Sequence, residues 1–368
     1  MSSNSDCDLF LRACRREPVP RTPVWFMRQA GRYMKEYRDL RAKHSLLDLC
    51  QTPELAAQVT LQPIRKIGVD AAIIFADLLL PAQAMGMDLR FAEGEGPVLA
   101  PAIRSAEAVA KLGAVQDGEL SYVAEAIRIV CRELAGKTPV IGFCGAPFTV
   151  ASYMIEGSGS RTFLNTKRMM YESPEVWQAL MRKLVPVLAE YLKSQAAAGA
   201  GAVQIFDSWV GCLSPEDYRA YVLPYSRELI ACVAEAGVPI IHFGTGTATL
   251  LELMREAGDS VIGHGIEHGT GHVIGHGIGH VIGIDWRIDL GEAWQRVGYD
   301  VAVQGNLDPV TLFAPRELLR ERVERILRSA AGRPGHIFNL GHGILPETPV
   351  ENVQAVVEMV SQFRLENS

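Results

Sequence analysis

The cysteines of this chain lack the spacing of a disulfide framework or of a zinc site. They are seven in number, and no two of them form a C-x-x-C pair. Their positions are Cys7, Cys14, Cys50, Cys131, Cys144, Cys212 and Cys232. An odd, scattered set is typical of the reduced thiols of cytosolic proteins, whereas secreted disulfide domains and zinc ribbons use paired cysteines.

The sequence also lacks an excess of positive charge. Its 36 Lys and Arg residues are outnumbered by 42 Asp and Glu residues, so the formal net charge is -6. A protein whose main partner is nucleic acid usually carries a basic surface, and we therefore expect no such partner. An anionic ligand would have to be bound by a local cluster of arginines.

No segment is apolar for long enough to cross a membrane. The longest apolar run is interrupted by Asp77 and Pro81, whereas a spanning helix needs about 20 apolar residues. Residues 1–16 are polar and charged, without the apolar core of a secretory signal. We therefore expect a cytoplasmic protein that does not contact the membrane.

What the sequence does contain is a regular alternation of short apolar segments and amphipathic helical segments. The apolar segments, each predicted as a strand, are residues 24–27, 71–76, 139–143, 202–206, 238–241, 281–284, 301–303 and 336–340. The predicted helices are residues 8–17, 33–49, 53–67, 119–135, 174–198, 215–236, 247–257, 315–330 and 349–364. Residues 82–104 contain Gly and Pro and are expected to form an irregular loop or hairpin.

This alternation predicts an α/β fold with a parallel sheet, because helical crossovers bury both faces of short apolar strands. Eight strands are the number that closes a (β/α)8 TIM-type barrel, so we predict a single barrel domain over residues 1–368. The active site of such a barrel lies at the C-terminal ends of the strands. An open doubly wound sheet is the alternative, but its Gly-rich phosphate turn is absent after the first apolar segment.

Polar residues follow several of these strands. They are Arg28, Asp77, Ser208, His242, Asp285, Asn306 and His342. Arg28 and Arg32 flank the small residues of one loop, and a guanidinium binds a carboxylate through two parallel hydrogen bonds. The loop therefore indicates a carboxylate site. The alternative is that both arginines lie on a surface helix and pair with Glu36.

Four segments together resemble the uroporphyrinogen decarboxylase family. They are Phe-Met-Arg-Gln-Ala-Gly-Arg-Tyr at 26–33, Phe-Ala-Asp at 75–77, the stretch 142–157 from Gly-Phe-Cys-Gly-Ala-Pro-Phe-Thr to Tyr-Met-Ile-Glu-Gly, and Asn-Leu-Gly-His-Gly at 339–343. The resemblance extends from about residue 8 to 364. It implies a cytoplasmic, homodimeric enzyme of haem biosynthesis that converts the four acetate groups of uroporphyrinogen III to the methyl groups of coproporphyrinogen III.

The resemblance also implies the site residues. Asp77 and Arg28 would be catalytic, and the substrate contacts would be Arg28, Gln29, Ala30, Gly31, Arg32, Asp77, Tyr153, Ser208 and His342. Eight carboxylates surround the rim of the substrate, and four pyrrole N–H groups lie at its centre. Asp77 could accept hydrogen bonds from these N–H groups and stabilise the cation formed when a pyrrole carbon is protonated. The protonated ring takes up the electrons of the broken bond, so neither a metal nor another cofactor is expected.

Each residue also has a purely structural interpretation. Asp77 could cap the helix after its strand, and Tyr153 could be a buried ring with a satisfied hydroxyl. Ser208 alone says little. His342 lies between two glycines, which indicates a close backbone approach or an unusual turn. His242 is interpreted as a strand-end or core histidine and is left out of the site.

A second hypothesis is a zinc-dependent corrinoid methyltransferase, which the same superfamily contains. By resemblance, its metal would be held by a His-x-Cys pair at the fifth strand, together with a distant Cys. Residues 242–244 are His-Phe-Gly and supply no thiolate. The arginine loop also favours the decarboxylase.

A Gly/His-rich insertion departs from the family pattern at residues 264–283. Val-Ile-Gly occurs three times between 261 and 283, with histidines every four residues at His264, His268, His272, His276 and His280. A helix would align these histidines as a metal-binding stripe, but glycine costs roughly 1 kcal/mol per residue in a helix relative to Ala. We therefore expect a flexible, catalytically neutral loop that precedes a strand at 281–284, on the face opposite the active site. Metal storage by this stretch is the least favoured function.

Overall fold

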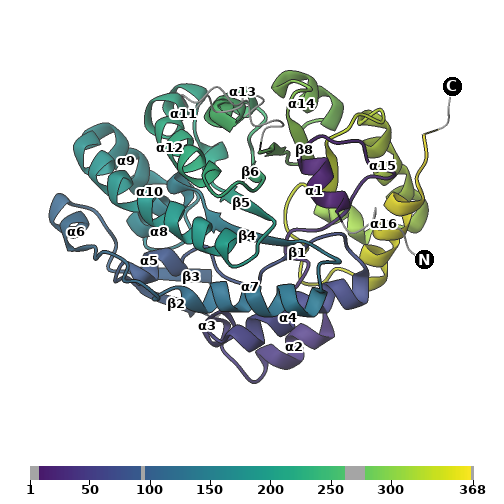
Figure 1. Cartoon of the computed structure of the whole chain (residues 1–368). Helices are drawn as coiled ribbons and strands as arrows, with labels where there is room; N and C mark the ends of the chain where they lie inside the picture. Colours follow the sequence, from purple (N-terminus) through teal and green to yellow (C-terminus); the bar gives the residue numbers. More distant parts are fainter. Residues whose placement is uncertain (1–7, 93–95, 262–277, 366–368) are drawn as a thin grey trace, which may run out of the picture.

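The computed structural model describes residues 8–92, 96–261 and 278–365. Its centre is a curled, parallel sheet of seven strands (Figure 1). The strands are β1 (Ala72–Ile73), β4 (Val140–Gly145), β5 (Ala202–Asp207), β6 (Ile240–Gly244), β7 (His280–Gly283), β8 (Ala302–Leu307) and β9 (His336–Leu340). β2 (Asp88–Ala92) and β3 (Gly96–Ala100) form a separate antiparallel hairpin.

Helices surround this sheet in Figure 1. Those before β6 are α1 (Leu9–Cys14), α2 (Lys35–Arg41), α3 (Leu46–Gln51), α4 (Pro53–Ile67), α5 (Leu80–Ala84), α6 (Ala106–Lys111), α7 (Ser121–Leu134), α8 (Pro147–Glu156), α9 (Leu164–Glu172), α10 (Pro174–Ala197), α11 (Pro215–Tyr221) and α12 (Leu223–Ala234). The later ones are α13 (Leu251–Ala257), α14 (Leu290–Val297), α15 (Arg316–Ser329) and α16 (Val350–Gln362). Short 3-10 helices are η1 (Val210–Cys212), η2 (Asp259–Val261) and η3 (Pro309–Phe313). Among the described residues, no helix combines the length and the apolar character needed to cross a membrane.

The order of the strands excludes the doubly wound sheet. The sheet runs β1-β4-β5-β6-β7-β8-β9, and each strand pairs in parallel with the next one along the chain. In a doubly wound sheet the order of the strands reverses at a switch point, and no such reversal occurs among these seven strands. The doubly wound alternative is therefore wrong. Seven of the predicted strands are confirmed, with ends that differ from the predicted ones by a few residues.

The first predicted strand, residues 24–27, is reduced to a single bridge. Val24 pairs in parallel with Phe338 of β9, and the backbone amide of Trp25 donates to the carbonyl of Phe338 at 3.3 Å. On the other side, the amide of Asp70 donates to the carbonyl of Val24 at 2.8 Å. The segment therefore contacts both β9 and the residues that lead into β1.

Side-chain amides replace the backbone ladder after Trp25. The backbone amide of Phe26 donates to Oε1 of Gln29 at 3.1 Å, and the amide of Met27 donates to Oδ1 of Asn339 at 3.1 Å. These bonds satisfy the backbone donors without a neighbouring strand. As a result, the chain turns at residue 26 instead of continuing as a strand.

Two of the predicted helices are broken into pairs. Residues 33–49 divide into α2 and α3 because Ser45 and Asp48 form a reciprocal capping box that starts a new helix. Residues 215–236 divide into α11 and α12, with Pro224 in the first turn of α12. Helices α5, α6, α8, α9 and α14 were not predicted. The expected hairpin within residues 82–104 is confirmed as β2 and β3.

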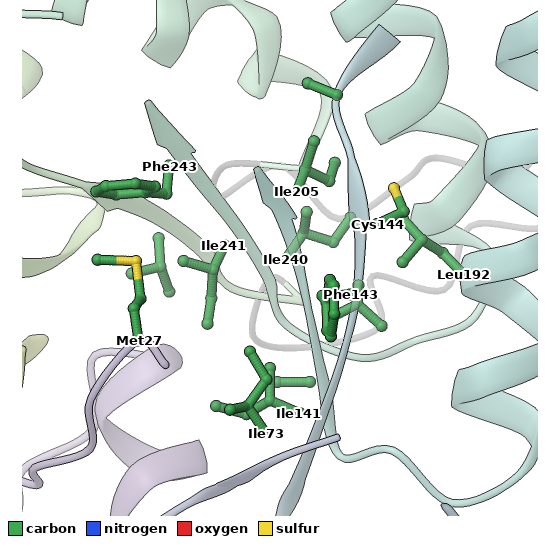
Figure 2. Packing of buried hydrophobic residues seen from close by; sticks show 14 of the residues in the cluster. Met27, Ile73, Ile141, Phe143, Cys144, Leu192, Ile205, Ile240, Ile241 and Phe243 are labelled. Carbon is green, nitrogen blue, oxygen red and sulfur yellow. The ribbon is translucent and has the colours of Figure 1, made fainter. Parts of the chain in front are cut away.

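One face of β4 packs closely against α10. On the helix side, a Cβ on Gly142 would lie only 2.7 Å from Oε1 of Gln195 in α10, so only glycine fits. The Gln195 amide bonds to both the N–H of Phe143, at 2.8 Å, and its carbonyl, at 3.0 Å. Figure 2 shows Cys144 beside Leu192 of α10 on this side. α10 is thereby fixed against the sheet.

A polar chain crosses the inner side of the sheet. The indole Nε1 of Trp25 donates to Oε1 of Gln304 at 2.9 Å, and Nε2 of Gln304 donates to Oε1 of Gln204 at 3.1 Å. All three side chains are buried. Because buried polar groups are costly without partners, these bonds fix the first segment relative to β5 and β8.

The described flank of the Gly/His-rich insertion lies near the start of β7. A Cβ on Gly279 would lie 2.8 Å from the carbonyl oxygen of Cys14, next to α1. This end of β7 is the one predicted to receive the insertion. Its residues 264–277, with His264, His268, His272 and His276, lie outside the described residues. His280 is the first residue of β7, and burial lowers its pKa to about 3, so this histidine is not part of an exposed metal stripe.

Removal of residues 264–283 should preserve the fold. Val261-Ile262-Gly263 would then take the place of Val281-Ile282-Gly283 in β7, and shortening a loop changes its closure entropy little. We expect a cooperative thermal transition within about 4 °C of that of the full chain. A control that removes 264–284 shifts the pairing of β7 by one residue and should be strongly destabilised. Unfolding of the first variant would contradict the repeat interpretation.

Candidate active site

A cavity of about 460 Å³ opens at the C-terminal ends of the strands. All of the predicted site residues except Gln29 line it, namely Arg28, Ala30, Gly31, Arg32, Asp77, Tyr153, Ser208 and His342. These residues come from five separate parts of the chain. Four of the seven polar residues expected together at the strand ends, Arg28, Asp77, Ser208 and His342, thus line one cavity, whereas His242, Asp285 and Asn306 do not line it.

Gln29 faces the interior and supports the loop. Its side chain is fully buried, and its Nε2 donates to the carbonyl of Ala71 at 2.9 Å. Tyr33 donates its hydroxyl to the carbonyl of Gln29 at 2.7 Å. Gln29 thus ties the arginine loop to the residue before β1, and its side chain does not line the cavity.

The two arginines do not form the surface pair with Glu36. Glu36 instead pairs with Lys66, with Oε1 2.6 Å from Nζ. Arg28 and Arg32 are exposed and line the cavity. Arg28 also has a backbone φ of 59°, a left-handed conformation that non-glycine residues adopt at a cost. The loop therefore presents both guanidiniums to the same opening.

The glycines beside His342 permit two close approaches. A Cβ on Gly343 would overlap the Cδ and Cγ atoms of Arg28, and a Cβ on Gly341 would overlap the backbone nitrogen of Trp286. This result confirms the close backbone approach expected from the sequence. Gly343 leaves the space through which the Arg28 side chain passes.

Asp77 follows β1 and lines the cavity. One carboxylate oxygen accepts a hydrogen bond from the backbone amide of Leu79 at 2.9 Å, so the expected capping role is present. Within the described ranges, no hydrogen bond joins the other oxygen to a protein group. Burial raises the pKa of Asp77 to about 6, although the Leu79 N–H and Arg28 oppose the shift. The carboxylate is therefore ionised at neutral pH and can still accept hydrogen bonds.

Three phenylalanine rings that contact one another line the cavity together with Asp77. The rings of Phe143 and Phe206 meet edge to face at 5.5 Å, and those of Phe206 and Phe243 at 6.0 Å. Figure 2 shows Phe243 near Met27, which also lines the cavity. Water is a poor competitor in such surroundings, so a charge there interacts strongly with a bound ligand.

The hairpin contributes residues that the sequence did not reveal. Phe91, Gly96 and Pro97 of β2 and β3 line the cavity, as does Leu46 of α3. The hairpin has no apolar period and no motif that indicates a ligand, so its position beside the cavity could not be predicted from the sequence. The aromatic and proline groups extend the apolar surface that a flat macrocycle could contact.

Tyr153 lines the cavity and packs against Trp209, which does not line it. Their ring centroids are 3.7 Å apart, with planes inclined by 32°. Burial, followed by the nearby Asp77 charge, raises the pKa of Tyr153 to about 12. Its hydroxyl is therefore protonated at neutral pH and can donate to an anion.

Ser208 is held from behind by a buried network. Thr149 donates its hydroxyl to Asp207 at 2.8 Å and accepts from the backbone amide of Trp209 at 3.3 Å. The other Asp207 oxygen lies 3.8 Å from Nε2 of His242, which is fully buried. His242 does not line the cavity, and its exclusion from the site agrees with this position.

His342 is neutral at physiological pH. Burial lowers the pKa of His342 to about 4, and the charges of Arg28 and Arg287 lower it further. Its Nδ1 accepts a hydrogen bond from the backbone amide of Gly343 at 2.7 Å, so the ring proton is on Nε2. His342 can therefore donate a hydrogen bond without adding charge.

The described ranges contain no group of three or more His, Cys, Asp and Glu residues arranged to hold a metal ion. The stretch expected to hold zinc in the methyltransferase hypothesis, residues 242–244, places Phe243 in the cavity and supplies no sulfur ligand. Geometry in this part of the chain thus gives the metal hypothesis no support.

Substitution of Asp77 by Asn should stabilise the chain at neutral pH. Because the pKa is raised in the folded chain, the ionised carboxylate lowers the free energy of unfolding by its full amount above about pH 6. This destabilisation decreases as the pH falls and is absent below the ordinary pKa of 3.8. We expect a gain in Tm of about 2–4 °C at pH 7.5 and a smaller gain at pH 5.

The matched control for this experiment is Asp308→Asn. The Asp308 carboxylate likewise accepts from the backbone amide two residues on, that of Val310, at 2.9 Å, but lies outside the cavity. Its substitution should give no gain. An equal change in both variants, or a loss of Tm in Asp77→Asn, would show that the Asp77 charge is not held at a cost.

Solved structures show the same fold. A methyltransferase from Methanosarcina mazei superposes with a TM-score of 0.77 at 19% identity, over 98% of this chain and 99% of that chain. A B12-independent methionine synthase from Shewanella sp. W3-18-1 gives a TM-score of 0.54 at 11% identity, over 84% and 88%. At these identities the likeness establishes the fold alone.

Sequence relatives are much closer. Uroporphyrinogen decarboxylases from Carboxydothermus hydrogenoformans and Solibacter usitatus are 55% and 54% identical to this chain, over 97% and 96% of its length and 96% and 97% of theirs. The family model of uroporphyrinogen decarboxylase (URO-D) matches residues 5–363. The match covers nearly the whole chain and includes every residue that lines the cavity. This chain therefore belongs to the uroporphyrinogen decarboxylase family.

Proposed function

We infer that this chain decarboxylates uroporphyrinogen III to coproporphyrinogen III and CO2 in haem biosynthesis, without a cofactor. The observation that carries this inference is a single carboxylate, Asp77, in a cavity that is also lined by aromatic side chains and by two exposed arginines. The relatives named uroporphyrinogen decarboxylase support the same substrate. The rim of a porphyrinogen carries eight carboxylates and its centre four N–H donors, which matches a cavity lined by two arginines and one carboxylate acceptor.

Asp77 would act on the charge that develops during the reaction. A proton adds to a pyrrole carbon, and the ring becomes cationic. The bond between the acetate methylene and its carboxylate then breaks, its electrons neutralise the ring, and CO2 leaves. A second proton converts the methylene to a methyl group, and the ring carbon then releases the first proton, which restores the neutral pyrrole. Asp77, hydrogen bonded to the pyrrole N–H groups, stabilises the cation between these steps.

The remaining residues would bind and orient the carboxylates. Arg28 and Arg32 hold them through charge-assisted hydrogen bonds, and Gly31 and Ala30 keep the loop small. Tyr153, Ser208 and neutral His342 would donate further hydrogen bonds. Arg28 could also deliver the proton, but a guanidinium is a weak acid, so binding is its first role.

The assembly and the location of the chain are also proposals. We propose that the segment at Val24 completes the sheet as an eighth strand and that the chain forms one (β/α)8 barrel domain. The bonds of Val24 and Trp25 to the segments on both sides support closure. A homodimer and a cytoplasmic location follow from the family resemblance.

Asp77→Asn should abolish most turnover, since Asn keeps the size of the side chain but removes its charge. Loss of one such preorganised group costs on the order of a hundredfold in rate or more. The measurement is an anaerobic assay with uroporphyrinogen that quantifies the partly decarboxylated products. Asp77→Glu should also be poor because its extra methylene displaces the carboxylate. Near-normal turnover by Asp77→Asn, with the Asp308→Asn control intact, would exclude this role.

Arg28→Ala and Arg32→Ala should reduce kcat/KM by about tenfold or more, because each removes a charge-assisted bond to a substrate carboxylate. Lysine should restore the activity only in part, since it lacks the planar fork. Binding of an anionic porphyrin should weaken as salt is raised, and less so in the variants. Unchanged kinetics in both alanine variants would return this loop to a structural role.

A further inference from the structure

A second recess lies beside the main cavity. The proposed function assigns no ligand group to this recess. Both the cavity and the recess are lined by Ser208, so they meet at that residue. The second recess also includes Trp209, Thr245 and Arg287. A ligand group that passes Ser208 from the main cavity would therefore reach Arg287.

The guanidinium of Arg287 is held on two sides. Its central carbon lies 3.9 Å from the centroid of the Trp286 ring, and its Nη1 forms an ion pair with the carboxylate of Asp285. Asp285 is only 1% exposed and also accepts from the backbone amides of Arg287, at 3.0 Å, and Gly246. The guanidinium of Arg287 is thus held by a buried carboxylate, which is itself fixed by two backbone amides.

One edge of the same guanidinium is unoccupied. The Arg287 side chain is 49% exposed, and no hydrogen bond to another described residue uses its Nε or Nη2. These two groups form the side-on edge that binds a carboxylate through parallel hydrogen bonds. A surface arginine usually pays side-chain entropy to bind an anion, but the contacts with Trp286 and Asp285 already restrict this one.

The charge of Arg287 also acts on His342, which lines the main cavity. This charge, like that of Arg28, contributes to the low pKa of His342. The rings of Trp286 and His342 lie 6.3 Å apart, edge to face. Positive charge therefore flanks His342 both from the arginine loop and from the segment after β7.

We propose that Arg287 binds a rim carboxylate of the tetrapyrrole, directed past Ser208 into the second recess. The inference rests on the proposed function and adds a specificity-determining residue to it. Arg28 and Arg32 would hold carboxylates on one side of the macrocycle, and Arg287 would hold one on another. Asp285 would act as a positioning residue through its contact with Arg287.

The experiment compares Arg287→Ala and Arg287→Lys with the full wild-type chain in the anaerobic uroporphyrinogen assay. We expect Arg287→Ala to raise KM by on the order of tenfold while kcat changes less than about twofold, because the contact is equal in the ground and transition states. Lysine should recover part of the loss. Binding of uroporphyrin should also depend less steeply on salt in Arg287→Ala.

Arg128→Ala is the matched control, because Arg128 is 53% exposed, forms an ion pair with Glu125 and lies on α7, outside both recesses. It should behave as wild type. The inference would be overturned, while the proposed function stands, if the KM of Arg287→Ala were within twofold of wild type. It would also be overturned if the variant lost both kcat and thermal stability while the salt dependence of uroporphyrin binding stayed unchanged. Absence of turnover by the wild-type chain itself would overturn both.

Discussion

The carboxylate of Asp77 lies in surroundings that oppose its charge, and the rest of the site is arranged around it. Burial raises its pKa, while one backbone amide and the Arg28 charge limit the rise. The balance leaves the group ionised at neutral pH but only partly satisfied. A substrate with several converging N–H donors would supply the missing hydrogen bonds, so binding and stabilisation of a cation would share one interaction.

The scaffold positions the groups that act on this carboxylate. Gln29 ties the arginine loop to the residue before β1, and Asn339 of β9 accepts a hydrogen bond from the backbone amide of Met27. Gly343 leaves room for the Arg28 side chain. None of these three groups needs to touch the substrate. Their positions explain why a loop with an unfavourable backbone conformation at Arg28 can be held in place.

Much of this arrangement could be predicted from the sequence because apolar strands and strand-end polar residues have a clear local pattern. The period of the apolar segments located seven strands, and the glycines beside His342 indicated the close approach at Trp286 and Arg28. Other features depend on distant partners. The strand expected at 24–27 is shortened because the side-chain amides of Gln29 and Asn339 replace its ladder, and no local pattern shows such bonds.

The same limit applies to the site. Gln29 was grouped with the substrate contacts because it lies in the motif, but its side chain satisfies buried backbone groups. The cavity residues of the β2–β3 hairpin and the anchored Arg287 had no signal, since each acquires its position from packing. Spacing along a chain shows which residues can meet, and the fold decides which way each side chain points.

The pH dependence of kcat/KM for uroporphyrinogen tests the central claim most directly, because it reports the groups that must be ionised in the free enzyme and substrate. If the ionised Asp77 stabilises the cationic ring, kcat/KM should fall below about pH 6, where this carboxylate takes up a proton. A profile that stays level from pH 7.5 down to pH 5 would contradict the account.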